Sequence, residues 1–270
     1  MLLVIWQIAA VRLNQPWIFP KLIETPFPEQ DKQGVINILV HPYVDIYASG
    51  SLFSNTIISL LRVLIGFTLA AVVGVTLGLI MGALLPIRHL LEPLIELLRP
   101  LCPIAWLPFA MVLFKLKTLP NLLGLGYTHT IFDRVQLGMI FVLFVGGFFP
   151  ILTNTLDGVA GVRRNYLALA RMLGAGRYQS FMHVYLSAAL PMIFTGLRQG
   201  IGLCWFVIIA AEMMTGADSG IGYLLMYAAA QAGMDVVIAC MLIIGTIGAL
   251  LNFIMRWSMQ TLVRWHSKEI

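Results

Sequence analysis

The stretch from Ile57 to Leu85 reads IISLLRVLIGFTLAAVVGVTLGLIMGALL, and Arg62 is its single charged residue. A helix needs about 20 mostly apolar residues to cross the hydrocarbon core of a bilayer, so this segment is long enough to span a membrane. Gly74, Gly78 and Gly82 follow one another at intervals of four. That spacing puts them on one helical face, where a neighbouring helix can approach closely. The segment therefore predicts a transmembrane helix inside a multi-helix bundle.

The composition of the whole chain excludes a water-soluble globule. Of its 270 residues, 60% are apolar and 11% are charged, whereas soluble domains carry about 25% charged residues. A net charge of +5 would suggest nucleic-acid binding in a soluble protein. Here the basic residues lie at the ends of apolar segments, so they bear on membrane topology instead, and we expect no nucleic-acid partner. No shift in composition marks a linker, so residues 1–270 are expected to form a single transmembrane domain.

Further apolar segments predict an all-α integral membrane protein with about six transmembrane helices. Leu2–Val11 is too short to span by itself, so whether residues 1–12 form a complete first span stays open. It has neither the basic start nor the small-residue cleavage site of a signal peptide. Besides Ile57–Leu85, the predicted spans are Leu2–Val11, the shorter and proline-broken Pro100–Phe114, Gly138–Leu156, Met192–Met214 and Val236–Trp257.

The distribution of lysine and arginine predicts the orientation, because these residues are enriched in cytoplasmic loops. If the first segment starts in the cytoplasm, nine basic residues fall inside and four outside. The inside set is Arg88, Arg99, Arg163, Arg164, Arg171, Arg177, Arg256, Arg264 and Lys268, and the outside set is Lys21, Lys32, Lys117 and Arg134. We therefore expect residues 160–190, which hold four of the arginines, to form a cytoplasmic loop.

This loop has a helical pattern of its own. Apolar residues recur at helical spacing from Tyr166 to Leu173, which predicts a short amphipathic helix. Gly174-Ala175-Gly176 then breaks the helix, and a helical pattern resumes over Arg177–Leu186, ahead of Pro191. A transport bundle without its own energy source has to receive force from a partner. A short rigid helix in this loop is suited to dock that partner.

The segment Ala168–Pro191, ALARMLGAGRYQSFMHVYLSAALP, resembles the signature loop of binding-protein-dependent ABC permeases. In that family the loop has Glu-Ala-Ala, a Gly after three further residues and a later Leu-Pro pair. Ala170, Gly174, Leu190 and Pro191 stand at the matching positions here. The resemblance implies the bundle of a type I ABC importer permease. In such permeases this loop forms a coupling helix that sits in a cleft of the ATPase subunit.

Two positions depart from the family's pattern. Ala168 stands where the family usually has Glu, and Leu169 where it has Ala. Whether the missing carboxylate alters coupling stays open, whereas the Gly break and the Leu-Pro pair do not depend on it. The residues that the resemblance assigns to ATPase coupling are Ala168, Leu169, Ala170, Arg171, Leu173, Gly174, Ala175 and Arg177.

Other blocks narrow the resemblance to permeases for nitrate, sulfonates, taurine and bicarbonate. They are Arg99-Pro100 with Pro103–Pro108, Phe149–Thr155, Thr195–Arg198, Ala210–Met213 and Gly220–Leu224. The resemblance implies a small solute, most simply an anion, and leaves nitrate, bicarbonate, taurine and alkanesulfonates open. A pyrimidine precursor is the alternative within the same family.

The resemblance also implies partners and a location. Cytoplasmic ATP-binding subunits would hold ATP and Mg, and a periplasmic or lipid-anchored binding protein would deliver the substrate. A second permease copy is needed to face two ATPases, which gives a homodimer if one gene product serves the complex. The implied location is the bacterial cytoplasmic (inner) membrane.

No motif for chemistry of its own occurs in the chain. The GxxxxGK[ST] phosphate loop is missing, so we expect ATP hydrolysis on a partner chain. HExxH, GxSxG and CxxC motifs are also missing, and the five histidines and three cysteines are scattered. We therefore expect no enzyme activity, no metal site and no bound cofactor. A secondary transporter is the alternative class, but such proteins typically show internal repeats, and we find none.

Polar residues inside the predicted spans are candidates for a translocation path, because ionisable groups in a bilayer are costly and usually serve a pathway or a pair. Arg198 and Glu212 are 14 residues apart on one predicted helix, about 21 Å, so they cannot pair with each other. Two interpretations stay open: an anion path, or hydrogen bonds and ion pairs between helices. The candidates are Arg62, Trp106, Thr153, Asn154, Arg198 and Glu212.

Overall fold

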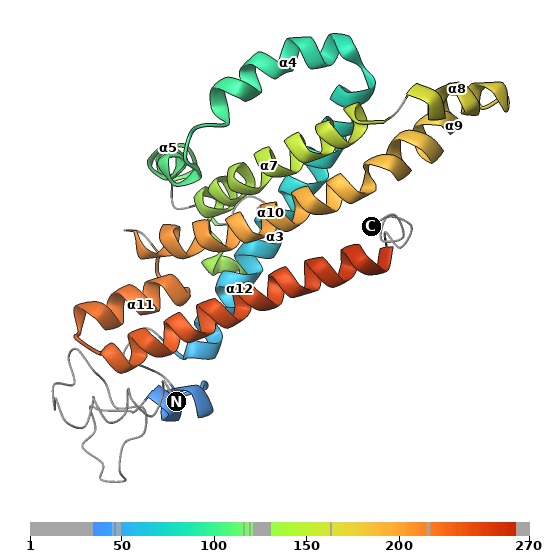
Figure 1. Cartoon of the computed structure of the whole chain (residues 1–270). Helices are drawn as coiled ribbons and strands as arrows, with labels where there is room; N and C mark the ends of the chain where they lie inside the picture. The colour runs from blue at the N-terminus through green and yellow to red at the C-terminus, as the bar shows by residue number, and fades with distance from the viewer. Residues whose placement is uncertain are drawn as a thin grey trace.

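The computed structural model of the chain is a helical bundle (Figure 1). It describes residues 35–44, 46, 50–115, 117–118, 120, 131–162, 164–214 and 217–262. Within these ranges it contains no β-strand, only an antiparallel bridge between Thr118 and Gln136. The elements are α2 (Val35–Val40), α3 (Leu52–Ala83), α4 (Leu85–Leu98), η2 (Pro103–Trp106), α5 (Leu107–Phe114), η3 (Ile131–Arg134), α7 (Leu137–Ala160), α8 (Arg164–Met172), α9 (Arg177–Ser180), the π-helical η4 (Phe181–Tyr185), α10 (Leu186–Met213), α11 (Ile221–Ala230) and α12 (Met234–Leu262).

Four helices are long and apolar enough to cross a membrane. They are α3, α7, α12 and the continuous helix Tyr178–Met213, which contains α10. The all-α membrane prediction is therefore confirmed, and four predicted spans have a matching helix. The predicted span Leu2–Val11 lies outside the described residues. The matched spans are Ile57–Leu85, Gly138–Leu156, Met192–Met214 and Val236–Trp257.

The short, proline-broken span predicted over Pro100–Phe114 is part of a bent pair of helices. Helical structure there covers only Pro103–Phe114, about 18 Å of helix, which is too short for a bilayer core of about 30 Å. Residues 103–114 are long and apolar enough for a membrane span only when they are taken together with α4. The two helical segments are bent by 91° relative to each other. Proline explains the bend, because Pro100 and Pro103 have no backbone N–H with which to continue the helix that ends at Leu98.

Glycines let α7 pack closely against α3. A Cβ added at Gly78 of α3 would lie 2.7 Å from the Cβ of Thr155 on α7. One added at Gly82 would lie 2.5 Å from the Cβ of Val159. Such distances are shorter than real Cβ contacts, so only glycine permits this approach. The packing groove predicted along α3 is confirmed.

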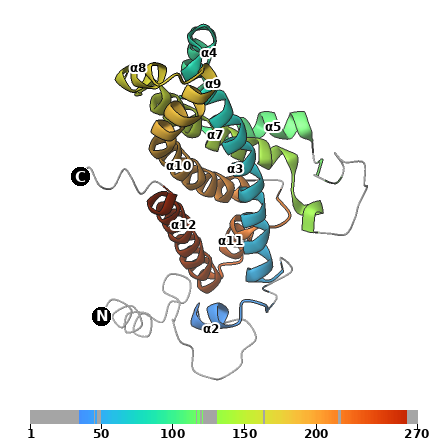
Figure 2. The same cartoon turned by 90° about the vertical axis from the view of Figure 1, so that its right-hand side faces the viewer.

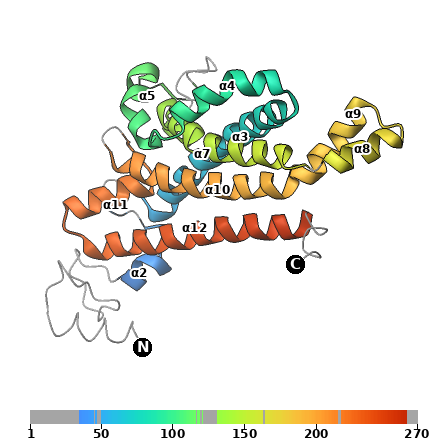
Figure 3. The same cartoon turned by 45° about the horizontal axis from the view of Figure 1, so that its top comes forward.

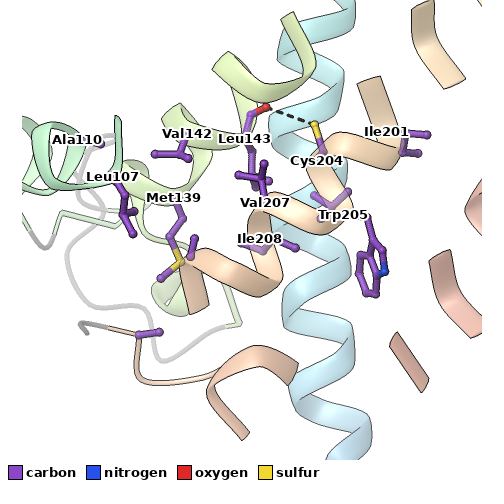
Figure 4. Close-up of a cluster of buried hydrophobic side chains, with 13 residues drawn as sticks. Leu107, Ala110, Met139, Val142, Leu143, Ile201, Cys204, Trp205, Val207 and Ile208 are labelled. Carbon is purple, nitrogen blue, oxygen red and sulfur yellow. Dashed lines mark hydrogen bonds between the residues drawn. The ribbon is translucent and has the colours of Figure 1, made fainter. Parts of the chain in front are cut away.

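Buried apolar side chains join α5, α7 and α10 in the cluster drawn in Figure 4. Cys204 of α10 is buried in it and donates its S–H to the carbonyl oxygen of Leu143 at 3.3 Å. Trp205 points toward α12, where its indole N–H donates to the carbonyl oxygen of Ile244 at 3.1 Å. Packing and hydrogen bonds together therefore hold α10 between α7 and α12.

The two ends of the bundle carry different elements, as Figures 1, 2 and 3 show consistently. The helices α8 and α9 project from one end, while α2 and α11 lie at the other. The helix Tyr178–Met213 connects these ends without a break. At 36 residues it is about 54 Å long. One helix thus joins the predicted cytoplasmic loop to the opposite side of the molecule.

Candidate functional site

Arg62 of α3 and Glu212 of α10 form a buried ion pair. Arg62 Nη1 and Glu212 Oε1 are 2.7 Å apart, and the side chains are 1% and 0% exposed. The pair joins the first half of α3 to the last turn of α10. This end of α10 lies beside α11, away from α8 and α9 (Figure 1). We call Asn55, Ser59, Arg62, Glu212 and Ser219 the charge cluster; all five are buried.

Every N–H of the Arg62 guanidinium has a partner, and a guanidinium carries five of them. Nε donates to the carbonyl oxygen of Arg134 at 3.2 Å, and Nη2 donates to the same oxygen. Nη2 also donates to Ser219 Oγ at 3.1 Å. Nη1 donates to the Ser219 carbonyl oxygen at 2.8 Å and to Glu212. No N–H is left over with which Arg62 could bind a passing anion.

Both oxygens of the Glu212 carboxylate also have hydrogen-bond partners. Its oxygens lie 2.9 and 2.8 Å from the Ser59 hydroxyl, which can donate its one proton to either. Oε2 also accepts from the Gly222 N–H at 3.0 Å. Gly220 has φ +120°, and a Cβ at that position would fall on the carboxylate. Glycine is therefore required there for two reasons, the backbone conformation and the lack of space.

The charge cluster also caps α11. The N–H of Gly220 donates to Asn55 Oδ1 at 2.8 Å, and the N–H of Ile221 donates to Ser59 Oγ at 2.9 Å. The first N–H groups of a helix have no partner within the helix, and α11 has no side-chain N-cap of its own. Side chains of α3 thus cap the N-terminus of α11. The charge cluster therefore links α3, α10 and α11 to one another.

This geometry bears on the two candidate path residues that it contains. Arg62 and Glu212 lie in an ion pair between helices, which is the second of the two interpretations of the sequence. Buried pairs of this kind are retained where both charges are hydrogen-bonded, as both are here. A role for either residue in a translocation path stays a prediction.

A second polar group lies at mid-length on α10, and we call Asn154, Arg198, Gln199 and Asn252 the polar belt. Arg198 Nε donates to Asn252 Oδ1 of α12 at 2.6 Å. Asn154 Nδ2 of α7 donates to Gln199 Oε1 at 3.0 Å. The belt therefore consists of two hydrogen-bonded pairs, one between α7 and α10 and one between α10 and α12. The candidate path residues Asn154 and Arg198 belong to different pairs.

The belt differs from the charge cluster in depth and exposure. Arg198 is 12 residues from the start of α10 and 15 from its end, about 18 and 22 Å, which is close to the middle of a membrane span. Gln199 and Asn252 are exposed, and Asn154 and Arg198 are half-buried. Polar groups at this depth on an uncovered surface are expected to face a partner or a water-filled path rather than lipid.

The other two candidate path residues are not joined to the belt by any hydrogen bond in the described ranges. Thr153 Oγ1 donates to the Phe149 carbonyl oxygen of its own helix at 2.9 Å. Trp106 packs edge-on against Phe109 and Phe141, with ring centroids 5.8 and 6.2 Å away. These contacts are those of packing residues, and a path role for Trp106 or Thr153 stays a prediction.

The predicted docking loop forms two short helices with a glycine between them. Gly174 has φ +80°, and the N–H of Ala175 donates to the Ala170 carbonyl oxygen at 2.9 Å. This is the usual glycine C-terminal motif of an α-helix. The N–H of Gly176 then donates to Gln179 Oε1 at 3.0 Å, which begins α9. The predicted break at Gly174 is confirmed.

Apolar side chains on this hairpin are exposed. Met172 and Leu173 are 83% and 86% exposed, and Ala170 is half-buried. We call Tyr166, Leu169, Met172, Leu173 and Tyr178 the coupling face. The role in ATPase coupling of residues 168–177 stays a prediction.

Several residues of the charge cluster and the polar belt were not predicted from the sequence. Asn55 and Ser59 were not predicted, yet together with the candidate Arg62 they recur at intervals of four and three on one face of α3, a signal that could have predicted a buried polar stripe. Asn252 is a polar residue within the apolar helix α12, and that contrast could have singled it out. The partner segment Ser219–Gly222 has no such periodicity, because it lies in what reads as a loop, and Gly220–Leu224 was noticed only as a block that resembles the permease family.

Comparison with known proteins shows to which class of proteins the chain belongs. Residues 74–268 match the family described as binding-protein-dependent transport system inner membrane component. A protein named as an ABC transporter permease in Methanocaldococcus jannaschii is 43% identical over 249 residues, which cover 92% of this chain and 83% of that protein. The bicarbonate transport system permease protein CmpB of Synechococcus elongatus is 34% identical over 267 residues, 97% of this chain and 86% of CmpB. The nitrate import permease protein NrtB of Leptolyngbya laminosa is 35% identical over 228 residues, 83% of this chain and 74% of NrtB.

These matches, together with the helical bundle, define a multi-pass transport subunit of the membrane. The chain belongs to the family of inner-membrane components of binding-protein-dependent ABC importers. The resemblance inferred from the sequence is confirmed, and so is the type I importer permease fold. The family works in general with ATP-binding and substrate-binding partners.

Proposed function

We propose that this chain is the permease subunit of an importer in which ATP hydrolysis on a separate subunit moves a small anion into the cytoplasm. The observation that carries the proposal is the coupling face, because exposed apolar groups outside the membrane mark protein interaction sites. The hairpin that bears it projects from the bundle and continues into the long helix of α10 (Figure 3). A displacement of the hairpin would therefore be conveyed along one helix to the charge cluster.

The proposed complex contains two copies of this chain, as a homodimer, in the bacterial cytoplasmic membrane. Each copy receives an ATPase subunit, which holds ATP and Mg, at residues 168–177. A periplasmic or lipid-anchored binding protein delivers the substrate from outside. Names of relatives that transport bicarbonate, nitrate and taurine support a small anion, with nitrate, bicarbonate, taurine and alkanesulfonates as the candidates.

Purification of the chain from membranes tests this proposal. A nucleotide-binding subunit is expected to copurify, and uptake of bicarbonate or nitrate by vesicles holding the complex and its binding protein is expected to require ATP inside. Omission of ATP with an ion gradient present is the matched control. Uptake driven by the gradient alone would contradict an ATP-driven importer and favour a secondary transporter.

We place the path along the polar belt, with Arg198 as the residue that offsets the charge of the anion. Arg198→Ala is expected to lower uptake at least about tenfold, because hydrogen bonds to a charged group contribute about 1.5–3 kcal/mol. The complex should still assemble, since Arg198 is half-buried and its described partner is one neutral amide. Uptake by vesicles is measured after copurification of the ATPase has been verified.

The matched control for this variant is Arg256→Ala. Arg256 is an exposed arginine near the end of α12, and it lies outside the belt. Its replacement is expected to leave uptake unchanged. If Arg198→Ala transports at the wild-type rate, Arg198 does not serve the path.

A further inference from the structure

We propose that one side of α4 is the contact surface between two copies of this chain, where Glu96 of each copy pairs with Arg99 of the other. The inference rests on the proposed function, which requires two permease copies. It names the surface through which the copies meet and the charges that join them. In a two-fold symmetric interface of this kind, each contact between two unlike residues occurs twice.

Two sides of α4 are apolar. Ile87, Leu91 and Ile95 recur at intervals of four and pack against buried residues of α3 and α7. Leu90 and Leu94 each come one position earlier, on another side of the helix, and they are 76% and 52% exposed. The helix lies on the outside of the bundle, away from α12 (Figures 1 and 3). Exposed leucines on such a helix suit contact with lipid.

The third side of α4 is charged. Arg88, Glu92 and Glu96 each come one position after a packed residue, and Arg99 follows directly after the last residue of the helix. One position is a rotation of about 100°, so these residues and the exposed leucines lie on opposite sides of the packed face. We call Arg88, Glu92, Glu96 and Arg99 the charged flank.

The four residues of the charged flank differ in whether they have a partner. Arg88 and Glu92 form an ion pair within α4, with 3.0 Å between Nη2 and Oε1. Glu96 and Arg99 are exposed, and neither has a hydrogen bond or an ion pair in the described part of the chain. One negative and one positive charge without a partner are therefore left at the end of α4.

The contacts on either side of these two residues give their depth. A Cβ added at Gly146 would lie 3.5 Å from Pro103 Cβ. Gly146 is about 14 Å from the start of α7 and about 21 Å from its end. Ile95 packs against buried residues nearer that end of α7. Glu96 and Arg99 come between Ile95 and Pro103, so they lie within the half of the span that is closer to α8.

Lipid does not suit the charged flank at this depth. Ionisable groups exposed to hydrocarbon are costly, and in membrane proteins they face a bundle interior, a water-filled cavity or a partner. An arginine can extend its long stem toward the headgroups, whereas a glutamate has a shorter stem. A partner that brings a positive charge to Glu96 and a negative charge to Arg99 would satisfy both residues.

A second copy of this chain brings both charges. A two-fold axis between two α4 helices can pair Glu96 with the partner's Arg99, and it then pairs Arg99 with the partner's Glu96 as well. The predicted span Leu2–Val11, which lies outside the described residues, contains no charged residue that could serve instead. An ATPase subunit in the cytoplasm does not reach side chains inside the span.

Two differently tagged copies of the full chain, expressed together without the ATPase so that it cannot bridge them, test this surface. Copurification of the second tag with the first is measured after solubilisation in mild detergent. Glu96→Arg in both copies, or Arg99→Glu in both copies, sets like charges opposite each other. Each is expected to lower copurification at least about tenfold, because like charges across an interface oppose association.

A mixed pair of copies decides between contacts within one chain and contacts between chains. One copy carries Glu96→Arg and the other carries Arg99→Glu, so every pair across the axis again joins opposite charges. Copurification is expected to return to within about twofold of the wild type. If Glu96 and Arg99 acted only within their own chain, the mixed pair would be as weak as the two matched pairs.

Arg256→Glu in both copies is the control for a reversed charge. Arg256 is an exposed arginine near the end of α12, and α12 lies on the side of the bundle away from α4 (Figure 1). Copurification of the Arg256→Glu copies should equal that of the wild type. Gel filtration of each variant verifies that it is folded, which we expect because Glu96 and Arg99 are exposed.

Three results would overturn the inference: wild-type copies that do not copurify, Glu96→Arg copies that copurify as well as the wild type, or a mixed pair as weak as the matched pairs. Failure of the proposed function is a separate outcome, because it appears as loss of ATPase copurification or of ATP-dependent uptake by the wild type. The contact surface can therefore fail while the importer assignment stands.

Discussion

Glu212→Ala lowers the stability of the folded chain by about 3–5 kcal/mol, the effect expected when one partner of a buried ion pair is removed. The Arg62 guanidinium would then be buried at 1% exposure with no counter-charge. Ser59 and the N–H of Gly222 would lose the same acceptor, and the start of α11 would lose its anchor. Thermal unfolding of the purified protein in detergent measures the loss.

An ion pair on the surface of α4 is the matched control. Arg88 and Glu92 pair at 3.0 Å on the surface of α4, with side chains 31% and 33% exposed. Because solvent screens such pairs, Glu92→Ala is expected to change the unfolding temperature little. Equal effects of Glu92→Ala and Glu212→Ala would show that the charge cluster does not fasten the bundle.

A double variant separates the charge from the packing. Arg62→Met combined with Glu212→Leu removes both charges, so no unpaired ion is left buried. Replacement of a buried pair by apolar residues is often tolerated, and the double variant is therefore expected to be more stable than Glu212→Ala alone. It should not recover fully, because Arg134 and Ser219 lose a hydrogen-bond donor.

Gly174→Leu is expected to uncouple ATP hydrolysis from import, with uptake lost while ATPase activity persists or the ATPase detaches. Gly174 has φ +80°, a conformation that costs about 1–2 kcal/mol for residues with a side chain. A Cβ at Gly174 would meet no atom within 4 Å. The strain would therefore act through the backbone, by changing how α8 ends and where the coupling face points.

Two replacements check this reason. Gly174→Asn should retain coupling, because asparagine tolerates the left-handed conformation. Gly176→Ser should also retain it, since Gly176 does not have a positive φ and a side chain there meets open space. Uptake and ATPase rate are measured in vesicles for each variant. Wild-type import by Gly174→Leu would show that this hairpin is not the coupling element.

The order of the spans and the two short helices around Gly174 could be predicted from the sequence because both are local patterns. An apolar run as long as Ile57–Leu85 has no stable alternative to a helix in a bilayer. A glycine two residues after the last turn of α8 ends that helix whatever surrounds it. At Pro100–Phe114 the prolines predicted a short, broken span, but they did not predict that it pairs with α4 across a bend of 91°, because proline marks a break without giving its angle.

What only the tertiary structure decided is which polar groups meet. Periodicity puts Arg62 on one face of α3, but it does not say that this face meets residue 212, which is 150 positions away. Whether the N–H groups of an arginine already have hydrogen-bond partners depends on its neighbours in space. Arg62 has a carboxylate and two carbonyl oxygens around it, whereas Arg198 has one amide among the described residues. Both are single arginines in apolar helices, and the sequence alone cannot tell them apart, since hydrogen-bond saturation is a property of the packed bundle.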